Sequence, residues 1–171
     1  KTYQVPVIGG DLVSGKDCSI SVGVCGEVQK GLFLSRKGAR IGDSIYVSGT
    51  LGLAKLGLKL STSKKSKFSS LEKDSLEKFL KPKIQITLGI NLRKIANSCI
   101  DISDGLLGDL NHICKESRVG AELEKDLIPF VGTFEEAMTW GDDYELCFTV
   151  PKNKERKLKE ISKKTKIKLY K

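Results

Sequence analysis

The sequence predicts a fold of the α/β (α+β) class, in which helices pack on a mixed sheet. Apolar residues recur at every second position in some segments and at every third or fourth position in others, which are the periods of strands and helices. The two kinds of segment alternate along the 171 residues without an internal repeat. With 39% hydrophobic and 30% charged residues, the chain has a globular composition, and its length allows a buried core.

The N-terminal part is expected to contain three strands, followed by a helix and a loop. Ile20, Val22 and Val24 alternate with small or polar residues, as in a strand. Regularly placed leucines predict a helix, and the run rich in serine and lysine after it predicts a loop. The expected strands cover residues 3–8, 19–28 and part of 40–49, the helix covers 51–60, and the loop covers 61–70.

The remainder of the chain is expected to alternate helices with short strands. Leu106, Leu110 and Ile113 fall on one stripe of a helix, and the first of these helices must end before Pro82. The expected helices cover residues 71–80, 84–97, 104–117, 133–138 and 153–164, and the expected strands cover 98–102, 121–124, 144–150 and 166–170.

The net charge of +9 is concentrated at one end of the chain. Residues 152–171 contain ten Lys and Arg against two Glu, which accounts for +8 of the +9. A run of charge usually forms the solvated face of a helix, so binding to nucleic acid or to a membrane is disfavoured. A basic nucleic-acid-binding module that uses Lys152–Lys171 stays as an alternative.

The cysteines indicate a reducing compartment rather than a metal site. The five cysteines are scattered, form no Cys-X-X-Cys pair and accompany a single histidine, which disfavours zinc. We expect them to be small buried residues in the reduced state. No signal peptide is visible, and no apolar run approaches the roughly 20 residues that span a bilayer. A cytoplasmic location is therefore expected.

A near match to a phosphate-binding loop is rejected. Residues 10–17 fit the pattern GxxxxGK[ST] except that Asp17 replaces the hydroxyl residue. Such a loop must open a helix so that its N–H groups meet phosphate, whereas residues 19–28 alternate like a strand.

Two carboxylates stand where a strand gives way to a helix. Asp101 and Asp104 flank Ser103, which is a favourable N-cap residue, and a helix start offers N–H groups to an anion. Carboxylates beside a phosphate are favourable when Mg²⁺ bridges them, because this ion takes one or two carboxylates together with phosphate oxygens and water. Spacing alone leaves ordinary helix capping as the alternative.

Three further groups lie in turns or beside strands. Asp11 follows two glycines, Asp142 belongs to an acidic cluster at residues 140–145, and Arg36 has the fork geometry that clamps a phosphate. Taken singly, each is compatible with a turn or a surface residue. His112 lies opposite the leucine stripe of its helix and is interpreted as non-catalytic.

Taken in order, these segments resemble the thiamine-monophosphate kinase family. That family shares a superfamily with aminoimidazole ribonucleotide synthetase and selenophosphate synthetase. The similarity covers nearly the whole chain and is most specific around Asp101 and Asp142. The matching segments are residues 8–11, 34–43, 45–52, 96–107 and 141–150.

The resemblance implies an enzyme that transfers the γ-phosphoryl group of ATP to thiamine phosphate, with Mg²⁺ as cofactor. No residue need act as a nucleophile, because the protein mainly positions the substrates and stabilises charge. The implied ATP contacts are Gly10, Asp11, Arg36 and Ser103, the implied metal ligands are Asp11, Asp101 and Asp104, and the implied substrate contact is Asp142.

The resemblance also implies a domain division. Residues 1–29 would be the remnant of an N-terminal ATP- and metal-binding domain, and residues 30–171 a synthetase-like C-terminal domain that is incomplete at its end. The chain begins and ends in strand-like segments, which is expected of a fragment. The missing parts would supply further metal-binding aspartates and a homodimer interface, so we expect the fragment alone to be inactive.

Two departures from the family pattern keep other functions open. Asp142 stands where the family usually has glutamate, and Leu12-Val13-Ser14 stands where it usually has Thr-Thr-Arg. A related ATP-dependent synthetase with a different acceptor and an inactive paralogue are the alternatives.

Overall fold

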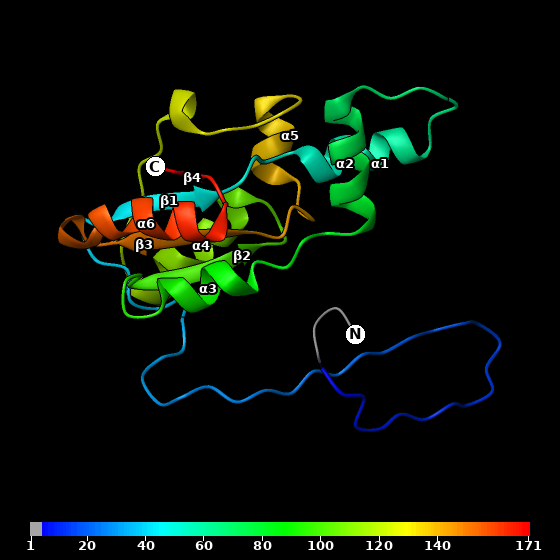
Figure 1. Ribbon diagram of the computed structural model, residues 1–171, viewed down its shortest axis with the longest axis horizontal. Coiled ribbons are helices and arrows are strands. Elements are labelled where there is room, and N and C mark those ends of the chain that lie inside the picture. The colour runs from blue at the N-terminus through cyan, green and yellow to red at the C-terminus, as the bar shows by residue number, and fades with distance from the viewer. Residues whose placement is uncertain (1–4) are drawn as a thin grey trace.

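The computed structural model describes residues 5–171, and its first strand is β1 (Ser44–Ser48). Residues 5–43 contain no helix or strand, and residues 5–31 are all exposed. In Figure 1 the exposed residues 5–31 run away from the body as an extended chain, whereas Leu34 and Ala39 pack against the body. The expected strand at 19–28 is therefore wrong, as is the described part (5–8) of the strand at 3–8; residues 3 and 4 lie outside the described residues. A strand needs a neighbouring strand for its backbone groups, and these segments pair with none within residues 5–171.

Four strands form one sheet in the order β2-β3-β1-β4. Besides β1 they are β2 (Ser98–Ile102), β3 (Glu145–Val150) and β4 (Leu169–Tyr170). All three pairings are antiparallel, and a parallel bridge between Leu51 and Phe130 lies outside the named strands. The register sets Asp101 opposite Leu146 and Ile102 opposite Glu145. The end of β2 therefore lies beside the start of β3.

Helices cover both faces of this sheet (Figure 1), which confirms the predicted α/β (α+β) class. The sheet itself is antiparallel and not mixed as expected. The apolar residues of α4 and α5 pack on one face, and those of α3 and α6 pack on the other, while α1 and α2 pack on each other beside the sheet. The helices are α1 (Leu53–Ser61), α2 (Ser70–Leu80), α3 (Ile86–Leu92), α4 (Leu106–Ser117), α5 (Phe134–Thr139) and α6 (Arg156–Thr165), with 3₁₀ turns at Lys125–Leu127 and Lys152–Lys154.

Strand β3 is buried on both faces and joins the two halves of the core. Cys147 packs with the residues of α4 and α5, whereas Phe148 and Val150 pack with those of α3 and α6. Phe148 is fully buried and stacks on Tyr46 of β1, with ring centroids 5.7 Å apart. This two-sided burial explains the unbroken apolar run Leu146-Cys147-Phe148 within the strand.

Other predicted elements also differ from the structure, among them the strand expected at 166–170, which covers only Leu169–Tyr170. The helix expected at 84–97 covers only Ile86–Leu92, because Arg93 is extended and Lys94 has a left-handed φ of 65°. The helix expected at 104–117 begins at Leu106. Residues 121–124 form no strand and lead into a 3₁₀ turn.

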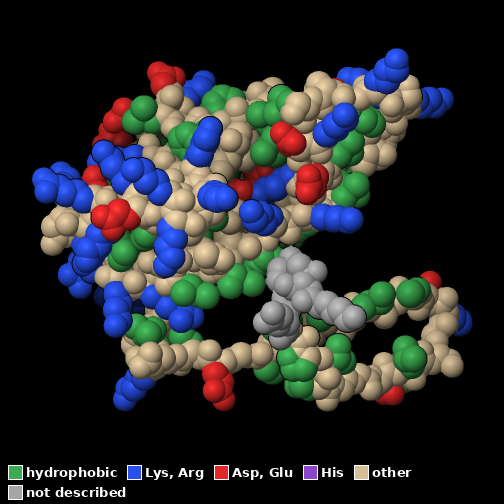
Figure 2. All heavy atoms as spheres, viewed as in Figure 1, with side chains coloured by type: hydrophobic (Ala, Val, Ile, Leu, Met, Phe, Trp, Pro, Cys, Tyr) green, Lys and Arg blue, Asp and Glu red, His purple; other side chains and the backbone are tan. Residues whose placement is uncertain are grey.

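The basic C-terminal segment forms an amphipathic surface helix. Leu158 and Ile161 of α6 are buried in the core, while most of its lysines are exposed. Figure 2 shows Lys and Arg side chains gathered over the end of the molecule where α6 lies. Within residues 5–171 no helix is long and apolar enough to cross a bilayer. Cys147 is buried as expected, but Cys18 and Cys25 are exposed, because they lie in the extended segment.

Candidate functional site

The loop that precedes β3 lies directly against the end of β2. The Asp142 amide donates to the Ser103 carbonyl oxygen at 3.0 Å, and the Tyr144 amide donates to the Ile102 carbonyl oxygen at 2.9 Å. Gly141 makes this approach possible, because a Cβ atom there would lie 1.7 Å from the Ser103 oxygen. The acidic loop and the β2–α4 junction are thus brought together.

The Tyr144 phenol contacts Asp142 and lies within electrostatic range of Asp101 and Asp104, the other two acidic residues that the sequence singled out in these segments. Its hydroxyl donates to Asp142 Oδ1 at 3.3 Å. Burial raises the pKa of Tyr144, and the negative charges of Asp142, Asp101 and Asp104 raise it further. All three carboxylates therefore lie within electrostatic range of one phenol.

Two residues of the loop have strained backbones. Asp142 has a φ of 66° and Tyr144 a φ of 48°, a left-handed conformation that costs non-glycine residues about 1–3 kcal/mol each. Such a conformation persists only where its surroundings hold it. The alternate residues, Asp143 and Glu145, are both buried and supply that support.

Asp143 anchors the loop to the start of α1. Its carboxylate accepts hydrogen bonds from the Gly52 amide at 2.7 Å and from the Ala54 amide at 3.1 Å. Burial raises the pKa of Asp143, while these two bonds oppose the rise. Gly52 precedes α1 and has no side chain to cap it, so Asp143 caps this helix from about 90 residues away. Lys55 of α1 also lies over the Trp140 ring, 3.2 Å from its centroid.

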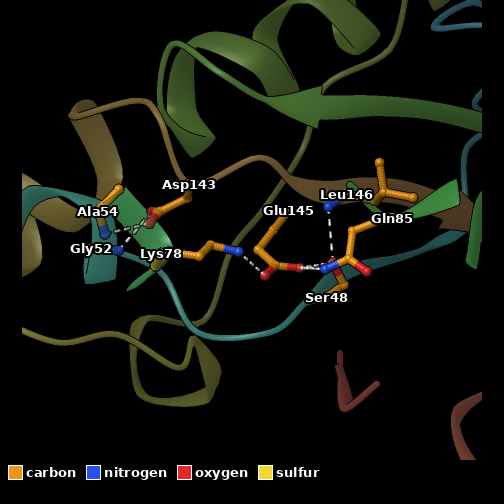
Figure 3. Close-up of polar contacts among 8 residues, drawn as sticks. All are labelled: Ser48, Gly52, Ala54, Lys78, Gln85, Asp143, Glu145 and Leu146. Atoms are coloured by element: carbon orange, nitrogen blue, oxygen red, sulfur yellow. Dashed lines mark hydrogen bonds and ion pairs between the residues drawn. The ribbon is translucent and has the colours of Figure 1, made fainter. Parts of the chain in front are cut away.

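Glu145 anchors the other side of Tyr144 inside a buried polar network (Figure 3). It pairs with the ammonium group of Lys78, accepts a hydrogen bond from the Ser48 hydroxyl, and accepts another from Gln85 Nε2 at 2.9 Å. The Ser48 hydroxyl in turn accepts from the Leu146 amide at 2.9 Å. The Lys78 and Glu145 side chains are only 10% and 7% exposed. This network ties the start of β3 to β1, to α2 and to the segment before α3.

The expectation that Ser103 caps α4 is wrong. The N-cap residue is Gly105, with a φ of 105° and no side-chain cap. Asp109, one turn inside the helix, reaches back and accepts from the Ser103 and Asp104 amides, both at 3.0 Å. Burial raises the pKa of Asp109, against the effect of these two bonds. The two amides are already engaged, so they are not free N–H groups for an anion.

The structure does not bring the remaining predicted site residues to this cluster. The Arg36 carbonyl accepts from Ser117, at the far end of α4 from Asp104, and 12 helical residues span about 18 Å. Gly10 and Asp11 lie in the exposed extended segment, where the Asp11 carboxylate accepts only from the Leu12 amide among the described residues.

The carboxylates of the cluster fit a magnesium–phosphate site better than a metal site built from protein alone. Within residues 5–171 no three His, Cys, Asp or Glu side chains are arranged to hold a metal ion. Asp101 and Asp104 are exposed, and no ion pair found in that range uses either of them. Two free oxygen donors at an open edge match Mg²⁺, which takes one or two carboxylates and completes its shell with phosphate oxygens and water.

Comparisons with known proteins agree on one family. Residues 40–171 match the family model described as AIR synthase related protein, C-terminal domain. The thiamine-monophosphate kinase of Escherichia coli (strain K12) is 41% identical over 160 residues, which cover 87% of this chain and 49% of that protein. The chain spans about half the length of the curated relatives it matches.

Solved structures of similar proteins have the same fold over most of this chain. The crystal structure of thiamine-monophosphate kinase from Stenotrophomonas maltophilia K279a matches with a TM-score of 0.77 at 34% identity, over 84% of this chain and 50% of that one. The structure named "AaThiL complexed with AMPPCP and TMP" matches with a TM-score of 0.66 at 35% identity, over 71% of this chain and 43% of that one.

Proposed function

This chain belongs to the family of AIR synthase related proteins through its C-terminal domain, and from this membership we propose that it is part of a thiamine-phosphate kinase. The reaction is the ATP-dependent phosphorylation of thiamine phosphate to thiamine diphosphate. The observation that carries the proposal is the contact of the loop that holds Asp142 with the end of β2, beside Asp101 and Asp104. The 41% identity to curated thiamine-monophosphate kinases supports the same activity.

Each predicted site residue has a role in this proposal. Asp101 and Asp104 would hold Mg²⁺, which supplies positive charge against the phosphates when bound. Asp142 would contact thiamine phosphate, and its position beside Ser103 brings the acceptor close to the metal ligands. Gly10, Asp11, Arg36 and Ser103 would contact ATP, with Asp11 a further metal ligand. The similarity to a structure in complex with AMPPCP and TMP supports both substrates.

The proposal includes a longer protein. Residues 1–29 belong to an N-terminal domain, and residues 30–171 belong to the C-terminal domain. The coverage of about half of each relative supports this division, and so does the exposure of every residue from 5 to 31. The whole protein would be a homodimer in the cytoplasm, where ATP is available, and sedimentation of the whole protein tests the dimer.

Replacing Asp101 by asparagine in the whole protein is expected to lower kcat/KM by about 100-fold, because one metal-holding charge is lost where the transition state needs it. The measurement is ADP release with thiamine phosphate over a series of Mg²⁺ concentrations. Asp74→Asn, which removes an exposed carboxylate on α2, is the matched control and should leave the rate unchanged. Wild-type protein that phosphorylates aminoimidazole-type acceptors or activates selenide, and not thiamine phosphate, would contradict the proposed acceptor.

The 171-residue chain by itself is expected to release no ADP with thiamine phosphate. In the chain alone, Asp11 and Arg36 lie apart from Asp101 and Asp104, so the ATP and metal contacts are not assembled. The same coupled assay, run at matched concentrations of chain and whole protein, makes the comparison. Robust turnover by the chain alone would contradict the division of the site between two domains.

A further inference from the structure

We propose that Tyr144 is a positioning residue, whose phenol holds the Asp142 carboxylate in the orientation that contacts thiamine phosphate. This inference rests on the proposed function, and it concerns a residue to which sequence reasoning assigned no role. It begins from one contact, the hydrogen bond that the Tyr144 hydroxyl donates to Asp142 Oδ1.

The backbone of Tyr144 is fixed at several points, so the position from which its side chain extends is fixed as well. The Tyr144 amide bonds to the Ile102 carbonyl, and the residue has a left-handed φ of 48°. Its two neighbours, Asp143 and Glu145, are buried and bonded to α1, α2 and β1. The chain therefore directs residues 143 and 145 into the protein and leaves 142 and 144 at the site.

The Asp142 carboxylate depends on this phenol. Among the residues that the structure describes, the Tyr144 hydroxyl is the group that donates to it. Asp101 and Asp104 lie near enough to add to the negative charge around the same phenol, and like charges repel one another. The Tyr144 hydroxyl is neutral, so it can hold the Asp142 carboxylate by a hydrogen bond without adding a positive charge that would compete with a metal ion.

The Tyr144 ring is not a core residue. It is 38% exposed, and a phenylalanine at this position would keep the ring while removing only the hydroxyl. The 3.3 Å separation is long for a bond between a hydroxyl and a carboxylate, so the effect of its loss is expected to be moderate. Tyr144→Phe therefore separates positioning of Asp142 from support of the fold.

The experiment is steady-state kinetics of the whole protein carrying Tyr144→Phe. We expect the KM for thiamine phosphate to rise about 2- to 12-fold, which is the range for one hydrogen bond. The KM for ATP, kcat and Tm should stay at wild-type values. In an Asp142→Asn background the same substitution should have no further effect on the KM for thiamine phosphate, because the two residues act as one unit.

Tyr46→Phe is the matched control. Tyr46 lies on β1 opposite Phe148, and burial and the Glu155 carboxylate raise the pKa of its phenol. The variant therefore loses a phenol hydroxyl outside the acidic loop and should keep all three kinetic constants. An unchanged KM for thiamine phosphate in Tyr144→Phe, an equal rise in both KM values, or a fall in Tm would overturn the positioning role. Wild-type protein with no turnover on thiamine phosphate would overturn the proposed function, and this inference with it.

Discussion

Replacing Gly141 by alanine is expected to force the acidic loop away from β2 and to lower the free energy of unfolding by about 3 kcal/mol, the upper part of the range for overpacking. The added Cβ would lie 1.7 Å from the Ser103 oxygen, 2.6 Å from its carbonyl carbon and 3.0 Å from the Asp104 Cα. All three are backbone atoms, so no side chain can rotate to relieve the contact. The bond from the Asp142 amide to Ser103 would also be lost.

Urea unfolding of the whole protein measures this effect, and ADP release measures its consequence for the site. Gly120→Ala is the control, because a Cβ at that position meets nothing within 4 Å and Gly120 has no positive φ. We expect the control to change stability by less than about 0.5 kcal/mol. Equal midpoints for the two variants would show that the loop does not lie against β2 as described.

Replacing Glu145 by glutamine is expected to lower the free energy of unfolding by about 3–5 kcal/mol, because it leaves the buried Lys78 ammonium without its partner. Glutamine keeps the shape of the side chain, so the loss reports mainly on the charge. Lys78 and Glu145 are nearly inaccessible to water, which means that solvent cannot replace the missing carboxylate. The support on one side of Tyr144 would weaken at the same time.

Thermal and urea unfolding of Glu145→Gln, compared with Glu72→Gln, makes this prediction quantitative. Glu72 pairs with Lys65, whose side chain is 47% exposed, and exposed pairs contribute about 0–1 kcal/mol. The double variant Lys78→Met with Glu145→Gln should recover much of the loss, since the unpaired buried ammonium group is then removed as well. A loss in Glu145→Gln no larger than in Glu72→Gln would contradict the buried pair.

Elements whose hydrophobic period is matched by burial could be predicted from the sequence. The stripe of Leu106, Leu110 and Ile113 faces the sheet as expected, and β2 and β3 lie where their residues predicted. Asp101, Asp104 and Asp142 were singled out by the resemblance to a known family, because each residue taken singly was compatible with a helix cap or a turn. The strand expected at 19–28 failed because periodicity reports a tendency to pair, and no partner strand lies within residues 5–171.

Contacts between distant side chains could not be predicted in the same way. Ser103 was a reasonable cap by its position, but Asp109 reaches back to the same amides. Lys78 and Glu145 are 67 residues apart, and linear spacing carries no information about such a pair. One signal was available in the sequence. Glu145 lies two positions before the buried Cys147, so both side chains lie on the same face of the strand. A carboxylate on the buried face of a strand requires a cation, and its partner could have been sought.

The order β2-β3-β1-β4 has a consequence for biosynthesis. Both β1 and β2 pair with β3, and the other neighbour of β1 is the still later β4. Ser48 precedes Glu145 by 97 residues, which a ribosome adds in about 5–20 s at 5–20 residues per second. β1 lacks its partner strand β3 for that whole time and β2 for the second half of it, and unpaired strands are prone to aggregate. The acidic cluster can assemble only after β3 has left the ribosome, so translation that stops earlier yields a chain with neither sheet nor site.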